Sequence, residues 1–76
     1  MADLKVAVIG CGAHAQEHFS MIAAEPRLHL AAIAETDGER LAQNRRDWKP
    51  EQSFSDYRQL LDTCDLDLVY ICTMPG

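Results

Sequence analysis

Short, continuous hydrophobic runs divide the chain and predict the strands of a parallel sheet. Residues 4–9, 28–34 and 66–72 are mainly apolar and show no regular polar alternation. Such runs are typical of strands that are covered on both faces. We therefore expect the last run, from Leu68 to Ile71, to be buried, and residues 52–54 to form one further, very short strand.

Between these runs, apolar residues recur at helical spacing. In residues 13–25 they fall on one helical face, and Pro26 ends the predicted helix. The residues of that face are Ala15, Phe19, Ile22 and Ala23. A later helix, capped by Ser55 or Asp56, has an apolar stripe formed by Tyr57, Leu60, Leu61 and Cys64.

The middle helix has sequence signals at both ends. Thr36 and Glu39 have the spacing of a capping box, so we expect Thr36 to cap this helix. Lys49 and Pro50 mark its end. Its inward-facing residues are few, namely Leu41, Ala42 and Trp48, which predicts shallow packing.

The alternation of strands and helices defines the fold class. It predicts an α/β domain with a parallel sheet of three to four strands and right-handed crossovers. The expected strand order is 3-2-1-4, with helices on both faces of the sheet. The chain has 76 residues, which is room for one small domain.

A glycine-rich turn follows the first strand directly. Gly10, Gly12 and Ala15 match the pattern G-x-G-x-x-G/A at a strand-to-helix junction. The first glycine allows the tight turn, the second lets a pyrophosphate approach the backbone, and the alanine lets the helix pack closely. The helix N-terminus favours the phosphate charge. The pattern therefore indicates a partial Rossmann fold that binds a dinucleotide.

An acidic residue, Glu35, ends the second predicted strand, 20 residues after Ala15. A carboxylate in this position can accept hydrogen bonds from both ribose hydroxyls of an adenosine. It would repel a 2′-phosphate, and residues 36–38 include no arginine. We therefore predict that NAD is the cofactor and that NADP is disfavoured.

Charge and composition narrow the classes of partner. The formal net charge is −5, and no basic patch suggests a nucleic-acid partner. No apolar run is long enough to span a membrane, and no signal peptide is predicted. The three cysteines form no CxxC pair, which favours a reducing, cytoplasmic location.

Two groups of candidate ligands and one cysteine point to no further chemistry. His14 and His18 lie one turn apart, but two ligands do not make a metal site. The acidic residues at positions 62, 65 and 67 lack the spacing of a calcium loop. Cys11 at a helix start favours a thiolate, but no resolving cysteine is near it in the sequence. We predict no metal site.

Four segments together resemble one family of enzymes. They are Val6 to Gly12, the acid Glu35, the segment from Phe54 to Leu61, and the run from Leu66 to Thr73. Their order and spacing are similar to those of the Gfo/Idh/MocA oxidoreductases, and the resemblance covers nearly the whole chain. It implies NAD(P)-dependent hydride transfer at a carbon of a sugar, cyclitol or similar polyol.

The resemblance also implies roles for individual residues. The turn formed by Gly10, Cys11, Gly12, Ala13 and His14 would hold the pyrophosphate. Glu35 and Thr36 would hold the adenosine ribose, and Thr73, Met74 and Pro75 would line the path of the cofactor. The family has Thr-Pro after this strand, whereas this chain has Thr73-Met74-Pro75, so the register of these contacts is open.

The family's catalytic lysine lies in a Glu-Lys-Pro motif beyond the last predicted strand, and its substrate domain follows later. Neither occurs in residues 1–76, so we predict a partial dinucleotide-binding domain without catalytic residues. Two alternatives stay open: a stand-alone nucleotide-binding or sensor module, and a methyltransferase that uses Glu35 for an adenosyl ribose. The predicted strand at 68–72 would have an open edge, through which we expect self-association.

Overall fold

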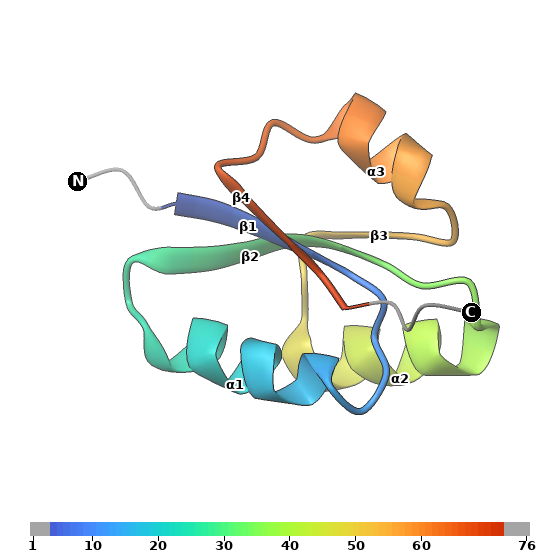
Figure 1. Cartoon of the computed structure of the whole chain (residues 1–76), viewed down its shortest axis with the longest axis horizontal. Coiled ribbons are helices and arrows are strands. Elements are labelled where there is room, and N and C mark those ends of the chain that lie inside the picture. The colour runs from blue at the N-terminus through green and yellow to red at the C-terminus, as the bar shows by residue number, and fades with distance from the viewer. Residues whose placement is uncertain (1–3, 73–76) are drawn as a thin grey trace.

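The computed structural model describes residues 4–72, which form a four-stranded sheet and three helices. The elements in chain order are β1 (Leu4–Ile9), α1 (Ala15–Ala24), β2 (Leu28–Ala34), α2 (Gly38–Trp48), β3 (Gln52–Phe54), α3 (Tyr57–Thr63) and β4 (Leu68–Ile71). All neighbouring strands pair in parallel, in the order β3-β2-β1-β4 (Figure 1). The predicted fold class and strand order are therefore confirmed.

The helices cover the two faces of the sheet unequally. Figure 1 shows α1 and α2 on one face and α3 on the other. On the first face, Val6, Val8 and Ile33 pack against residues of α1, chiefly Phe19. The ring of Phe19 stacks on that of Trp48 from α2, with ring centroids 5.4 Å apart. Contacts between α1 and α2 thus complete this layer of the core.

The opposite face has a smaller core. It is built from small residues of β1 and β2 and from a single buried residue of α3, Leu60. The other members of the predicted stripe are less buried, because Tyr57 and Leu61 are 50% and 48% exposed. With only seven residues, α3 presents one apolar position to the sheet rather than a full stripe.

The N-terminus of α2 differs from the prediction. Asp37, and not Thr36, is the capping residue: its carboxylate accepts hydrogen bonds from the N–H groups of Glu39 and Arg40, at 2.9 and 3.1 Å. Asp37 has the extended backbone that a cap requires, and its short carboxylate reaches these donors. The predicted capping residue is therefore wrong by one position.

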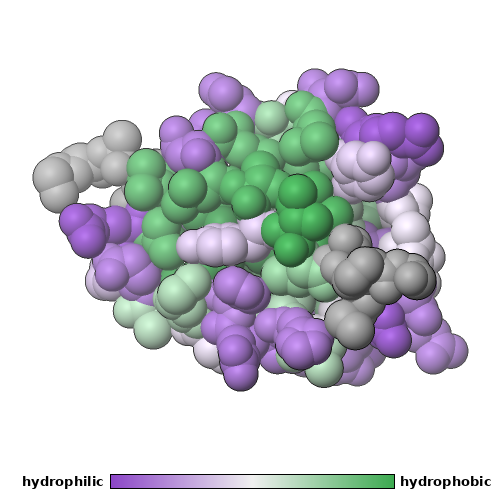
Figure 2. Space-filling view, in the orientation of Figure 1, coloured by the Kyte–Doolittle hydropathy of each residue, from purple (hydrophilic) through white to green (hydrophobic). Residues whose placement is uncertain are grey.

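The prediction that β4 is buried is also wrong. Leu68 and Val69 are 41% and 37% exposed, and Ile71 is 71% exposed. In the described part of the chain β4 pairs only with β1, and α3 packs on β2 and β3 instead of on β4. Figure 2 shows the resulting apolar surface at the centre of this view, where β4 lies in Figure 1.

Candidate functional site

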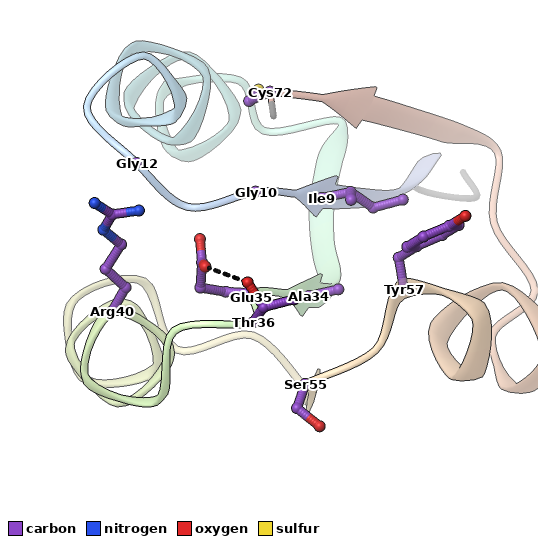
Figure 3. Close-up of a pocket in the computed structure, with 10 residues that line it drawn as sticks. All are labelled: Ile9, Gly10, Gly12, Ala34, Glu35, Thr36, Arg40, Ser55, Tyr57 and Cys72. Atoms are coloured by element: carbon purple, nitrogen blue, oxygen red, sulfur yellow. Dashed lines mark hydrogen bonds between the residues drawn. The ribbon is translucent and has the colours of Figure 1, made fainter. Parts of the chain in front are cut away.

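An open cavity of about 250 Å³ lies at the carboxyl ends of the central strands (Figure 3). This is the edge of a parallel sheet at which α/β proteins bind their ligands. The cavity is lined by Ile9, Gly10, Gly12, Ala34, Glu35, Thr36, Arg40, Ser55, Tyr57 and Cys72. These residues come from five separate segments that the sheet order brings together.

The two glycines of the turn have different structural roles. Gly10 has a φ of 88°, in the left-handed region that glycine adopts without strain, and its N–H donates to the carbonyl of Ala34 at 2.8 Å. A methyl group added to Gly12 would meet no atom within 4 Å. The space above Gly12 is therefore open, so a ligand can approach the backbone there.

The turn presents backbone donors that the protein itself leaves unused. Within residues 4–72, no hydrogen bond engages the N–H groups of Gly12, Ala13 and His14. His14 is the N-cap residue of α1, and its side chain makes no capping hydrogen bond. Ala15 is fully buried, which brings the helix close to β1. Successive free N–H groups at a helix N-terminus form a site for an anion such as a phosphate.

Glu35 ties the end of β2 to the glycine turn. One carboxylate oxygen accepts a hydrogen bond from the N–H of Cys11, and the other accepts one from the N–H of Asp37, both at 2.8 Å. The Thr36 hydroxyl donates a longer bond, 3.5 Å, to the second oxygen (Figure 3). Glu35 is only 8% exposed. Its carboxylate thus has a structural role besides the predicted contact with a ribose.

The thiol of Cys11 lies beneath the turn and does not face the cavity. It is 2% exposed and lies 3.8 Å from the carbonyl of Ala34. Burial, with a smaller contribution from the negative charge of Glu35, raises the pKa of Cys11 to about 12. The expected thiolate is therefore contradicted, because α1 begins only at Ala15 and desolvation outweighs any effect of its N-terminus.

A buried polar network joins the glycine turn to α2. Asn44, 4% exposed, donates from Nδ2 to the carbonyls of Cys11 (3.2 Å) and Arg40 (2.8 Å). Its Oδ1 accepts a 3.0 Å hydrogen bond from Nε2 of Gln16. The indole N–H of Trp48 donates to Oε1 of Gln16, also at 3.0 Å. The apolar pattern of α2 gave no signal for this network, because Asn44 is polar.

Sequence reasoning also missed residues of the cavity wall, among them Arg40, Ser55 and Tyr57. Arg40 reaches the cavity from the first turn of α2, beyond positions 36–38, where the sequence has no arginine. Figure 3 shows its guanidinium on the same side as the Glu35 carboxylate, near Gly12. Ser55 and Tyr57 come from the segment that follows β3. The short predicted strand at 52–54 was the one signal that could have placed that segment at this edge.

The remaining site predictions divide into three groups. Gly10, Gly12, Glu35 and Thr36 line the cavity, whereas Ala13 lies on an adjoining hollow between the turn and α2. The predicted cofactor residues 73–75 lie outside the described residues.

No cluster of three or more potential metal ligands occurs among residues 4–72. No helix in that part of the chain is long and apolar enough to cross a membrane.

The fold and the glycine turn together define an NAD-binding Rossmann domain. The sequence model described as "Oxidoreductase family, NAD-binding Rossmann fold" matches residues 4–76. The chain therefore belongs to the GFO_IDH_MocA family of oxidoreductases. No curated protein matches the chain in sequence.

Solved structures share this fold. An oxidoreductase from Agrobacterium radiobacter, in complex with NAD+, L-tartaric acid and magnesium, is 29% identical, with a TM-score of 0.90 over 96% of this chain. The WlbA dehydrogenase of Chromobacterium violaceum, in complex with NADH and UDP-GlcNAcA, has a TM-score of 0.91 over 96% of this chain at 22% identity. The apo scyllo-inositol dehydrogenase of Lactobacillus casei has 0.87 over 96%, also at 22%.

In each of these structures the matched region is a small part of the whole protein. The chain covers 21% of the first two proteins and 22% of the third. It therefore spans about a fifth of their length.

Proposed function

We propose that the chain supplies the cofactor-binding part of a dehydrogenase that transfers hydride between NAD and a hydroxyl-bearing carbon of a sugar, cyclitol or similar polyol. The observation that supports this proposal is the cavity at one edge of the sheet, which is lined by both Glu35 and the glycine turn. Two of the similar structures are an inositol dehydrogenase and a dehydrogenase in complex with UDP-GlcNAcA. These hydroxylated ring compounds support the polyol class.

In this proposal, each part of the cavity holds a different part of NAD. The turn from Gly10 to His14 receives the pyrophosphate through its unused N–H groups. Glu35, with Thr36 beside it, receives the adenosine ribose on carboxylate lone pairs that its two backbone bonds leave free. Thr73, Met74 and Pro75 line the continuation of the cofactor path, as the family resemblance implies.

We also propose that NAD binds more tightly than NADP. A 2′-phosphate placed at the ribose would meet the Glu35 carboxylate, and the repulsion would oppose binding. Arg40 lies on the same cavity wall and would attract that phosphate, so it reduces the discrimination. Titration of the wild type and of Arg40→Met with both cofactors tests this. We expect NAD to bind more tightly to both proteins, with the larger preference in Arg40→Met. Tighter binding of NADP by the wild type would overturn the preference.

We propose that the 76-residue chain by itself binds NAD but does not oxidise a polyol, because the predicted site includes no catalytic residue. The test is NADH formation by the purified chain with a panel of polyols. Substrate-dependent NADH formation would contradict the absence of catalytic residues. Expressed from the complete reading frame of its gene, the protein should support this reaction, and Gly12→Ala should abolish it. NAD binding there without NADH formation would favour a binding-only module.

Self-association through β4 is a further part of the proposal. The edge of β4 away from β1 has no strand beside it within the described residues, and Val69 and Ile71 expose apolar side chains next to it. An unpaired apolar edge is a template for pairing with a second copy. Sedimentation over a range of concentrations should show a dimer or larger species. Ile71→Lys should shift the distribution toward monomer, and a monodisperse wild-type monomer at high concentration would refute the idea.

We also propose a cytoplasmic location, on the evidence of the cysteines. All three are free thiols, at positions 11, 64 and 72. Unpaired cysteines are typical of proteins in reducing compartments. Fractionation of cells that express the tagged protein tests the location, and recovery outside the cytoplasm would contradict it.

A further inference from the structure

The polar network formed by Gln16 of α1 with Asn44 and Trp48 of α2 holds two carbonyl groups of the glycine turn. The Cys11 carbonyl accepts hydrogen bonds from Asn44 at 3.2 Å and from Gln16 at 3.4 Å. The Gly12 carbonyl accepts one from the same Gln16 amide at 3.3 Å and one from the N–H of Ala15 at 3.1 Å. Both carbonyls therefore point toward the side of the turn where Asn44 and Gln16 lie.

The direction of these carbonyls determines the direction of two N–H groups. A trans peptide unit is planar, with its C=O and N–H pointing in opposite directions. The N–H that shares a peptide plane with the Cys11 carbonyl is that of Gly12, and the Gly12 carbonyl shares its plane with the N–H of Ala13. Both N–H groups must point away from Asn44 and Gln16. They are also among the donors that no group within residues 4–72 engages.

We propose that Asn44 and Gln16 are positioning residues for the cofactor, which hold the turn so that the N–H groups of Gly12 and Ala13 are oriented to receive the pyrophosphate. Neither side chain needs to touch the cofactor for this role. Glu35 holds the preceding N–H, that of Cys11, from the end of β2. Hydrogen bonds to both its N–H and C=O groups thus fix the turn before the ligand arrives, which reduces the entropy lost on binding.

The role of Trp48 in this network is to orient the Gln16 amide. Its indole N–H donates to Oε1, so the amide must direct Nε2 at the turn and at Asn44. Stacking on Phe19 holds the indole in place. Trp48→Phe would keep an aromatic ring in that stack while removing the N–H that orients Gln16.

The test compares a ligand that has a pyrophosphate with one that lacks it. Asn44→Asp keeps the Oδ1 acceptor for Gln16 but removes the Nδ2 donor to the Cys11 and Arg40 carbonyls. It also adds a negative charge, so the uncharged Gln16→Met must show the same selective loss. We expect NAD affinity to fall about tenfold, the equivalent of one lost hydrogen bond, while adenosine affinity stays within about twofold. Gln16→Met should act in the same direction. Gln59→Met is the matched control, because Gln59 is exposed on α3 and outside the network.

The ratio of the two dissociation constants decides the question. Equal losses for NAD and adenosine in Asn44→Asp and Gln16→Met would show general destabilisation and overturn the proposal, as would unchanged NAD affinity. If Asn44→Asp does not fold, Gln16→Met decides by the same ratio, because solvent partly reaches that side chain. Failure of the wild type to bind NAD would refute the cofactor assignment itself and would be seen before any variant is compared.

Discussion

The two backbone hydrogen bonds to Glu35 lead to a quantitative prediction for Glu35→Gln. The carboxylate accepts one 2.8 Å bond on each oxygen, from Cys11 and from Asp37. Glutamine has the same shape but only one acceptor oxygen, so its NH2 group must face one of these two N–H donors. The variant therefore loses at least one charge-assisted hydrogen bond at a site that is 8% exposed.

The size of the effect follows from the strength of such a bond. A hydrogen bond to a charged group contributes about 1.5–3 kcal/mol to stability. A chain of 76 residues has a total free energy of unfolding of roughly 4–11 kcal/mol. Since 1 kcal/mol shifts the Tm of a domain of this size by about 4–8 °C, Glu35→Gln should lower the Tm by roughly 6–24 °C.

Thermal unfolding followed by circular dichroism measures this shift directly. Glu17→Gln makes the same change of charge at an exposed position in the first turn of α1. It should alter stability by less than about 1 kcal/mol, the contribution of one charge near a helix end. A Tm for Glu35→Gln that matches that of the control would refute a structural role for the Glu35 carboxylate.

Three further predictions concern the turn and its ligand. Gly12→Ala should fold with a nearly unchanged Tm, because the added methyl group meets nothing within 4 Å, yet it should lose NAD binding in a titration. Gly38→Ala, where the added methyl group also meets nothing within 4 Å, should retain binding. Retained binding in Gly12→Ala would contradict a close approach of the ligand. The raised pKa of Cys11 should stabilise the fold fully below pH 9 and progressively less between pH 9 and about 12, by at most about 1.4 kcal/mol per pH unit. Denaturant titrations of Cys11→Ala should show a shallower fall with pH in that range, and parallel curves for the two proteins would exclude the effect. NAD at a hundred times its dissociation constant should add about 2.7 kcal/mol, which raises the Tm by roughly 10–20 °C, and an unchanged Tm would argue against binding to the folded state.

The order of the strands could be predicted from the sequence because it depends on local patterns. The apolar runs, the glycine turn and the alternation with helices each indicate the same parallel sheet. Gly10 and Glu35 follow from that sheet, because they end neighbouring strands and must meet at one edge. Gly10 and Glu35, which the motif predicted at this edge, therefore lie close together.

The errors arise where tertiary contacts decide the outcome. Thr36 and Asp37 are both good capping residues, and the choice depends on the backbone conformation that the Glu35 hydrogen bond to Asp37 helps to fix. The exposure of Ile71 could not be predicted from its own run, because it depends on where α3 packs. Asn44 was missed for a similar reason. A polar residue within a thin apolar stripe gives no indication that its amide forms a hydrogen bond with the glycine turn.

The indole of Trp48 makes the domain an optical sensor of its own binding site. Trp48 is the single tryptophan of the chain, so its fluorescence reports one environment. Only the Gln16 side chain separates its N–H from the carbonyls of the glycine turn. NADH bound at the turn should quench this emission, because the nicotinamide can accept the excitation energy of the indole. Cofactor binding can therefore be followed in the unlabelled wild-type protein at low protein concentration.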